Sequence, residues 1–163
     1  MRPPRCRDDT RRMAVKSKEF RFPVAVEWSH DRTVVAHVPG KPELAIATPP
    51  EFFPDADPAV WSPEDAFASA AASCLAVTIL GIAAREQLPI EALRVEADGI
   101  AGRRPDGRFG FVRIEQRVEI AVDAADEQRV LALVERAEAG CLVAVSLDVD
   151  VETTVDVRIA APR

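Results

Sequence analysis

Cysteine and histidine are both scarce in this chain of 163 residues. It has three cysteines and two histidines, and no two cysteines are spaced as CxxC. A small secreted protein held together by disulfides has more cysteines in a shorter chain, and a structural zinc site needs several closely spaced Cys or His ligands. The sequence therefore argues against a disulfide scaffold, and we expect neither a metal nor a cofactor.

Long apolar runs are also missing, since none reaches the roughly 18 residues that a membrane helix requires. Hydrophobic residues make up 48% of the chain and charged residues 29%, which is the balance of an ordinary globular protein. A chain of this length forms one domain. We therefore expect a soluble, cytoplasmic protein that has no membrane partner.

Positive charge is concentrated in the first twelve residues, which have a net charge of +3. Because the whole chain has a net charge of −6, the remaining residues carry −9. A body that acidic repels phosphate backbones, so we expect no nucleic-acid partner. Residues 1–19 are predicted to be a disordered basic arm, and the folded domain is expected to span 20–163. Met13 stands just ahead of the first predicted strand and is favoured as the true start.

The first part of the folded domain has the pattern of a β meander. Turn residues separate three predicted strands at 20–28, 32–38 and 43–48, and a proline-rich loop follows at 49–58. A helix is then predicted from an N-cap at Ser62, with Pro63 at its first position, to about Glu86. The residues of this helix are apolar almost all round, which is typical of a helix buried on most faces. A second subunit is the simplest cover for it.

The second part of the folded domain has a different order of predicted elements, namely two strands, a helix and a final strand. Two long strands at 92–104 and 108–122 form a predicted hairpin with one covered face. A second helix is expected at 124–139, with Asp123 as its cap and Gly140 as its stop, and a final strand ends near residue 159. The order βββ-α-ββ-α-β favours an α+β fold, with a mainly antiparallel sheet packed on a long buried helix.

Two cysteines lie in the folded part, and spacing alone leaves their roles open. Cys74 is in the middle of the first helix, where the commoner role is that of a small buried hydrophobe. Cys141 follows Gly140 and opens a short turn, in which a free backbone N–H could lower the pKa of its thiol.

Both cysteine segments resemble those of the OsmC/Ohr family. The run 62–74 is similar to the segment in which a Pro-Glu pair precedes, by ten residues, a cysteine on an apolar helix. The stretch 137–147 is similar to the second segment, Ala-x-x-x-Cys-Pro-Val-Ser-x-x-Leu, but has Leu142 in place of Pro and Ala144 in place of Ser. The resemblance extends over about 20–159 and implies an OsmC-like fold that forms an intertwined homodimer.

That resemblance implies a thiol-dependent peroxidase of the antioxidant stress response. In the family, the first cysteine, here Cys74, attacks an organic hydroperoxide as a thiolate and becomes a sulfenic acid. The second, here Cys141, condenses with it to a disulfide, which an external dithiol of the lipoyl type or another thiol reduces. An arginine held by the glutamate of the Pro-Glu pair supports the thiolate; Glu64 matches that glutamate, and Arg32 is the candidate arginine, with Arg21 as the alternative.

The departures at 142 and 144 place the chain nearer to the broad OsmC-like group than to the best-known peroxidases. Two alternatives to a peroxidase therefore stay open. One is a non-enzymatic protein that binds a small lipid-like molecule on the same dimeric fold. The other is a thiol redox sensor that forms the disulfide without useful turnover.

Helix geometry independently favours a homodimer. Ten residues of α-helix rise about 15 Å, so Glu64 and Cys74 on one straight helix cannot touch. If both serve a single site, another chain must bring one of them there, and the site then lies at a subunit interface.

Overall fold

The computed structural model describes residues 18–123 and 126–159, so nearly all of the predicted basic arm lies outside the described residues. The α+β class is confirmed. The elements, in chain order, are β1 (Ala25–His30), β2 (Thr33–His37), β3 (Leu44–Ala47), α1 (Pro63–Arg85), β4 (Ala92–Arg103), β5 (Phe109–Val122), α2 (Glu127–Gly140), the short 3-10 turn η2 (Ala144–Ser146) and β6 (Asp150–Ile159).

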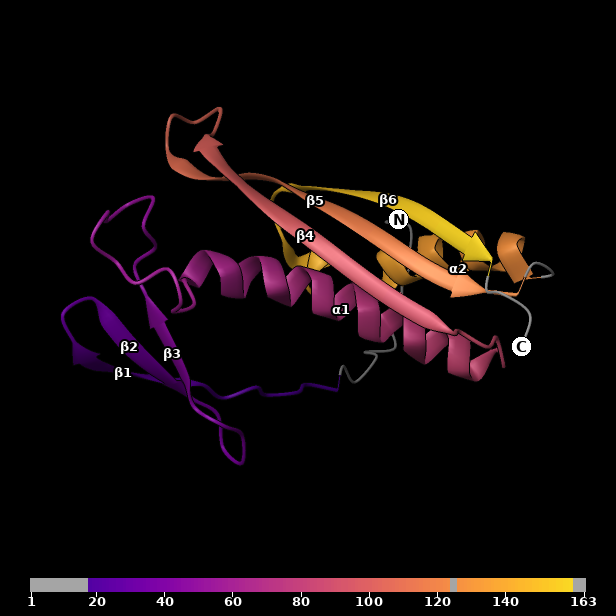
Figure 1. Ribbon diagram of the computed structural model, residues 1–163, viewed down its shortest axis with the longest axis horizontal. Coiled ribbons are helices and arrows are strands. Elements are labelled where there is room, and N and C mark those ends of the chain that lie inside the picture. Colours follow the sequence, from indigo (N-terminus) through magenta and orange to yellow (C-terminus); the bar gives the residue numbers. More distant parts are fainter. Residues whose placement is uncertain (1–17, 124–125, 160–163) are drawn as a thin grey trace, which may run out of the picture.

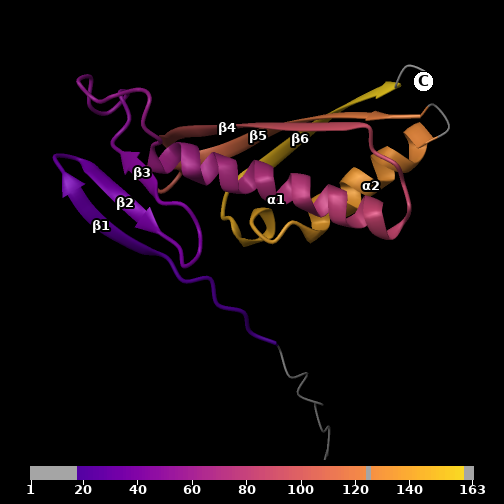
Figure 2. The ribbon, with the colours of Figure 1, turned by 60° about the horizontal axis from the view of Figure 1, so that its bottom comes forward.

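The strands form two three-stranded sheets. Strands β1, β2 and β3 pair in that order as an antiparallel N-terminal sheet, and β4, β5 and β6 form the second sheet. In the second sheet β4 and β5 are antiparallel, whereas β5 and β6 run parallel because α2 crosses over between them. Both helices lie on one face of the second sheet, and the N-terminal sheet stands beside the start of α1 (Figures 1 and 2).

The start of α1 is fixed by local hydrogen bonds, as the sequence predicted. The Asp65 N–H donates to the Ser62 hydroxyl at 3.0 Å, and the Ser62 N–H donates to the Asp65 carboxylate at 2.8 Å. This reciprocal capping box satisfies two backbone donors that the first helical turn leaves free, and Pro63 has no N–H to satisfy. The helix therefore begins at one defined residue and holds Glu64 and Cys74 in fixed positions.

The hydrophobic core lies between the second sheet and the two helices. Strand β5 presents one buried face, and α2 packs a buried face against it. The fully buried core side chains are Leu75, Ile79, Ile114, Val118, Ile120, Val122, Val130, Leu133, Val134 and Cys141. Cys141 is thus part of the core.

Helix α1 is buried along one face only, and here the prediction of a helix buried on most faces is wrong for the single chain. Leu75 and Ile79 are buried, whereas Val77 is 63% and Leu80 47% exposed. The 23-residue helix is also long and apolar enough, by length and composition, to cross a membrane, so the expectation that no segment reaches that length is wrong. Because the helix contains many alanines with interspersed Ser, Thr and Gly, it has no unbroken run of large apolar residues, and its length as an apolar segment is not evident from such runs.

Smaller corrections concern the ends of elements. Helix α2 begins at Glu127, and its N-cap is Asp126 rather than Asp123, with no side-chain capping bond. Gly140 is the last helical residue, and Cys141 is the C-cap. Strand β1 begins at Ala25 rather than near residue 20 because Pro23, just before it, has no N–H to donate to a ladder.

Candidate active site

Cys74 and Cys141, which are 67 positions apart in the sequence, meet where α1 passes the end of α2. Cys74 packs against the buried cluster that contains Cys141, and each thiol shifts the pKa of the other, with the Cys141 thiol in the role of donor to the Cys74 sulfur. Both are free thiols. The structure therefore brings together the two cysteines that the sequence singled out.

The environment of Cys74 favours its ionised form. Burial raises the pKa of this thiol, but hydrogen bonds from the Val143 N–H, the Cys141 thiol and the Leu142 N–H outweigh burial and hold the pKa below its ordinary value. The Val143 nitrogen lies 3.5 Å from the Cys74 sulfur. Such donors stabilise a thiolate because they supply partial positive charge without a full cation.

These N–H groups are available because α2 has just ended. The carbonyl oxygens of Cys141 and Val143 accept bonds from Val145 and Ser146 within the following turn, whereas the N–H groups of Leu142 and Val143 point to Cys74. Backbone donors carry no side-chain signature, so the sequence could indicate them only through the turn after Gly140. Thr78, one helical turn after Cys74, donates to the Cys74 carbonyl oxygen at 2.7 Å and was not singled out either.

Cys141 has the opposite tendency. It is 1% exposed, and burial raises the pKa of its thiol, as do the hydrogen bond with Cys74 and the negative charge of Cys74, although the Ala144 and Val143 N–H groups act against this. Backbone N–H groups of this turn, those of Ala144 and Val143, do lower the pKa of Cys141 as the sequence suggested, but burial outweighs them and the net shift is upward. The pair therefore consists of one thiol whose pKa is lowered and one whose pKa is raised.

Glu64 lies in the first turn of α1, away from the cysteines. Its Oε2 atom is buried and has no hydrogen-bond partner among the described residues. It lines a cavity of about 390 Å³ with aromatic walls, formed by Phe52 and by Phe111, whose ring is stacked on that of Phe67 at 4.3 Å. An unpaired carboxylate oxygen in such a place is costly unless a cation reaches it.

Arg32 lies in a third location. It lies in the two-residue turn between β1 and β2, and its guanidinium lies over the ring of Phe53, 4.0 Å from the centroid. It lines a cavity of about 790 Å³ between the N-terminal sheet and the proline-rich loop. In the part of the chain that the structure describes, no ion pair or hydrogen bond joins Arg32 to Glu64 or Cys74, and Arg21 is exposed ahead of β1.

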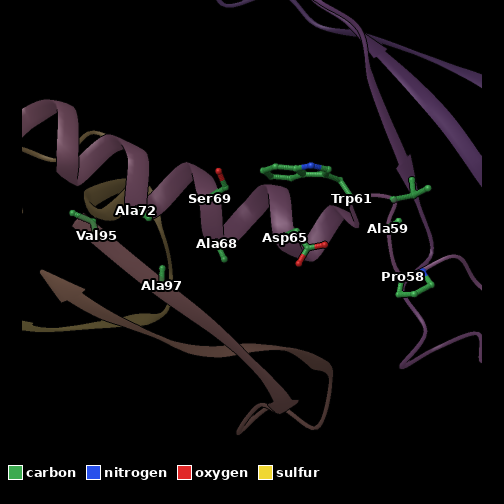
Figure 3. Close-up of a pocket in the computed structure, with 10 residues that line it drawn as sticks. Pro58, Ala59, Trp61, Asp65, Ala68, Ser69, Ala72, Val95 and Ala97 are labelled. Atoms are coloured by element: carbon green, nitrogen blue, oxygen red, sulfur yellow. The ribbon is translucent and has the colours of Figure 1, made fainter. Parts of the chain in front are cut away.

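A further cavity of about 500 Å³ runs beside the first half of α1 (Figure 3). Trp61 lies along the start of the helix, and Ala68 and Ala72 are on the side that faces β4 (Figure 3). Small alanine side chains leave this space open, and neither cysteine lines it. It offers room for a small apolar molecule but brings no thiol to that molecule.

Residues 56–156 match a family model described as OsmC-like protein. None of the curated proteins matches the chain in sequence. An OsmC-like protein of unknown function from Vibrio cholerae has a similar structure, with a TM-score of 0.79 and 21% identity over 85% of this chain and 100% of that one.

Two further structures are similar. An OsmC-like protein from Mycoplasma pneumoniae has a TM-score of 0.75 and 18% identity over 86% of this chain and 99% of its own. An organic hydroperoxide resistance protein from Elizabethkingia anophelis has a TM-score of 0.67 and 18% identity over 88% of this chain and 100% of its own. At these identities the likeness shows a shared fold.

Proposed function

The chain belongs to the OsmC-like protein family, and we propose that it is a thiol peroxidase that reduces organic hydroperoxides through Cys74 and Cys141. The matched region, 56–156, contains both cysteines. Proteins of similar fold include organic hydroperoxide resistance proteins from Elizabethkingia anophelis and Bacillus subtilis. The observation that carries the proposal is the contact between a Cys74 thiol of lowered pKa and a Cys141 thiol of raised pKa.

In the proposed first step, the Cys74 thiolate attacks the terminal oxygen of a hydroperoxide, ROOH. The S–O bond forms as the O–O bond breaks, and the leaving alkoxide takes a proton and departs as the alcohol ROH. Cys74 is thereby oxidised to a sulfenic acid. A lowered pKa matters here because only the thiolate is an effective nucleophile.

In the second step, the Cys141 sulfur attacks the Cys74 sulfur. The S–S bond forms, the Cys141 proton combines with the departing hydroxide, and water leaves. The two side chains already influence each other's pKa, so they are neighbours before the step begins. A dithiol of the lipoyl type, or another thiol, then reduces the disulfide and restores both thiols.

We also propose that a second copy of the chain supplies the positive charge that Cys74 lacks. Burial still opposes the thiolate, and a guanidinium beside the sulfur would offset it. Arg32 is the candidate, with Arg21 as the alternative, and Glu64 is the carboxylate that would hold the arginine, since a buried oxygen of Glu64 has no hydrogen-bond partner within the described part of the chain. In a homodimer Glu64, Arg32 and Cys74 can meet although they lie apart in one chain.

Exposed apolar surface supports this homodimer. Val77 and Leu80 are exposed on α1, and on β1 Val26 and the 74% exposed Trp28 lie on the surface. Large apolar side chains that cluster in this way are typical of a surface that another chain covers. The N-terminal sheet and α1 are therefore the proposed interface.

The proposal is tested by titrating the reduced protein with one equivalent of cumene hydroperoxide while free thiols are counted. We expect the wild type to lose both thiols rapidly. Cys141→Ser is expected to stop at a sulfenic acid, which a dimedone probe traps, and Cys74→Ser to keep Cys141 reduced. Equally slow thiol loss in all three proteins would contradict the peroxidase and favour the binding of a small molecule.

Turnover separates an enzyme from a sensor. With excess peroxide and a dithiol such as dihydrolipoamide, an enzyme consumes many equivalents of peroxide per chain. If the disulfide forms rapidly but the oxidised protein is reduced too slowly to sustain turnover with any dithiol or monothiol, the redox-sensor alternative holds instead.

A further inference from the structure

Two polar residues interrupt the buried face of the second sheet. Gln116 on β5 and Thr153 on β6 are register partners in the parallel pair. Both occupy positions where the neighbouring residues of the same face are Ile and Val. Gln116 is only 4% exposed, and neither its Nε2 nor the Thr153 hydroxyl has a hydrogen-bond partner among the described residues. Buried donors are rarely left unused in a folded protein.

These two side chains line a cavity of about 200 Å³ that also reaches Cys141. Its other walls are Leu75, Glu138, Ala144, Val145 and Val151. Cys74 does not line it. Cys141 is therefore a neighbour of Cys74 and also lines a cavity that Cys74 does not reach.

We propose that this cavity admits a small thiol that attacks the Cys141 sulfur when the protein carries the Cys74–Cys141 disulfide. The proposal rests on the proposed function for the existence of that disulfide. It adds which sulfur is attacked, from which side, and by what class of thiol.

The direction of attack follows from the chemistry of thiol–disulfide exchange. The incoming thiolate approaches a sulfur from the side opposite to the sulfur that leaves. The cavity is lined by Cys141 and not by Cys74, so a thiol in the cavity reaches the Cys141 sulfur, and Cys74 is the sulfur that leaves. The new S–S bond joins the small thiol to Cys141, the Cys74–Cys141 bond breaks, and Cys74 leaves as a thiolate.

The order of the two thiol pKa values favours the same choice. Exchange is faster when the leaving thiol has the lower pKa, and Cys74 is the one whose pKa is lowered. A second thiol, or the second sulfur of a dithiol, then attacks the sulfur of the bound molecule. Cys141 is released as a thiol and the small molecule as a disulfide, so electrons and protons balance.

The polar walls define the thiol that fits best. The Gln116 amide and the Thr153 hydroxyl can donate to an oxygen or nitrogen of the molecule, and the Glu138 carboxylate attracts a cation and repels an anion. A short thiol that carries an ammonium group, such as cysteamine, is expected to react faster than neutral 2-mercaptoethanol. Mercaptoacetate, an anion of similar size, is expected to be slowest.

The first test fills the cavity. The disulfide is made with diamide, which does not depend on peroxide chemistry, and its reduction by cysteamine is followed by acid quench and maleimide labelling. Ala144→Leu places a larger side chain in the cavity and is expected to slow reduction about tenfold or more. Ala139→Leu adds the same atoms to an exposed position on α2 and is the matched control.

Unchanged reduction in Ala144→Leu would overturn the proposal, and so would equal slowing in both variants. Because Ala144 is part of the turn after α2, the reaction of Ala144→Leu with peroxide serves as a second readout that reports on the turn itself. We expect the first thiol loss to keep its wild-type rate. Failure of the wild type to react with peroxide at all would sink the proposed function and leave this diamide-based test intact.

The second test uses the wild type alone. Acid quench during reduction by a monothiol, followed by alkylation and peptide mass mapping, locates the mixed disulfide. We expect the small thiol on Cys141 and the alkyl group on Cys74; the reverse arrangement at the earliest times would refute the proposal.

Charge gives a third readout. The rates of the three thiols, each divided by its rate with a small free disulfide, are expected to fall from cysteamine to mercaptoacetate. Glu138→Gln should remove this order while leaving 2-mercaptoethanol nearly unchanged. If the three thiols keep the same order of rates in Glu138→Gln, the thiol does not pass this carboxylate.

Discussion

The two halves of the molecule differ in how completely a single chain buries their apolar side chains and pairs their charged groups. From 63 to 159, the helices and the second sheet enclose a shared core, and the two thiols are in contact within it. From 18 to 61, the N-terminal sheet exposes large apolar side chains, and Arg32 forms no ion pair among the described residues. One chain thus brings the two sulfurs together, whereas the charged groups expected to support them are proposed to reach Cys74 only in a complex with a second chain.

Helix α1 connects the two halves, and its two sides show the same contrast. The inward side carries Leu75 and Ile79 and closes the core, while the outward side carries the exposed Val77 and Leu80. Cys74 lies on α1 at the boundary between these sides. A site at this boundary can be assembled partly within the chain and partly by a neighbour.

The largest effect is expected from removing a buried side chain of α1. Ile79→Ala leaves a cavity between α1 and the second sheet, so we expect a loss of about 2–5 kcal/mol in the free energy of unfolding. Urea unfolding followed by circular dichroism measures it. The loss should be the same at low and high protein concentration, because this contact lies within one chain.

Val77→Ala is the matched control, two positions earlier on the same helix. In the single chain it exposes less apolar surface and costs little, but in a homodimer it removes part of the interface. Its effect on the urea midpoint is therefore expected to grow with protein concentration. A large loss for Val77→Ala that does not depend on concentration would mean that one chain already buries both sides of α1.

The next largest effect concerns Arg32. Arg32→Ala is expected to slow the reaction of Cys74 with cumene hydroperoxide on the order of 100-fold, since one preorganised charged donor is lost. Arg21→Ala tests the alternative arginine in the same assay. If Arg21→Ala carries the larger effect, the supporting cation lies ahead of β1 and not in the β1–β2 turn.

Mixing variants tests whether the site spans two chains. Cys74→Ser and Arg32→Ala are both expected to be nearly inactive alone. If one chain gives Cys74 and the other gives Arg32, unfolding and refolding them together restores one intact site per mixed dimer, or about a quarter of the wild-type sites at equal amounts. A mixture no faster than its parts would place both residues in one chain.

The sequence predicted most of the C-terminal half because its signals are local. The Ser62 cap, the alternation of β5 and the apolar periodicity of α2 each depend on residues within one element, and the structure has these elements. The meeting of Cys74 and Cys141 came from resemblance. The parallel pairing of β6 was missed, since it depends on how α2 crosses over the sheet.

The remaining differences have a physical origin outside any single element. The pKa order of the two thiols is set by the backbone N–H groups of Leu142 and Val143, and every residue except proline has such a group. Gln116 and Thr153, whose buried side-chain donors have no hydrogen-bond partner among the described residues, lie within predicted strands, and only the pairing of β5 with β6 places them side by side. Neither feature has a motif that a sequence could display.

The smallest effect is expected from removing Cys141, the partner thiol of Cys74. Because its pKa is lowered, Cys74 has more thiolate at neutral pH than an ordinary cysteine, and its alkylation by iodoacetamide should reach half its maximal rate at a lower pH. Cys141→Ala removes one hydrogen-bond donor to that thiolate. We expect the pH midpoint to rise and the rate at neutral pH to fall about 2- to 10-fold, in line with the loss of one hydrogen bond.

Leu142→Ala is the control for this prediction. It keeps the backbone N–H of residue 142 and should leave the pH midpoint of Cys74 alkylation unchanged. Peptide mass mapping over a pH series measures both. A midpoint that Cys141→Ala does not move would assign the lowered pKa to the backbone donors alone, and the C-terminal half would then activate Cys74 without its partner thiol.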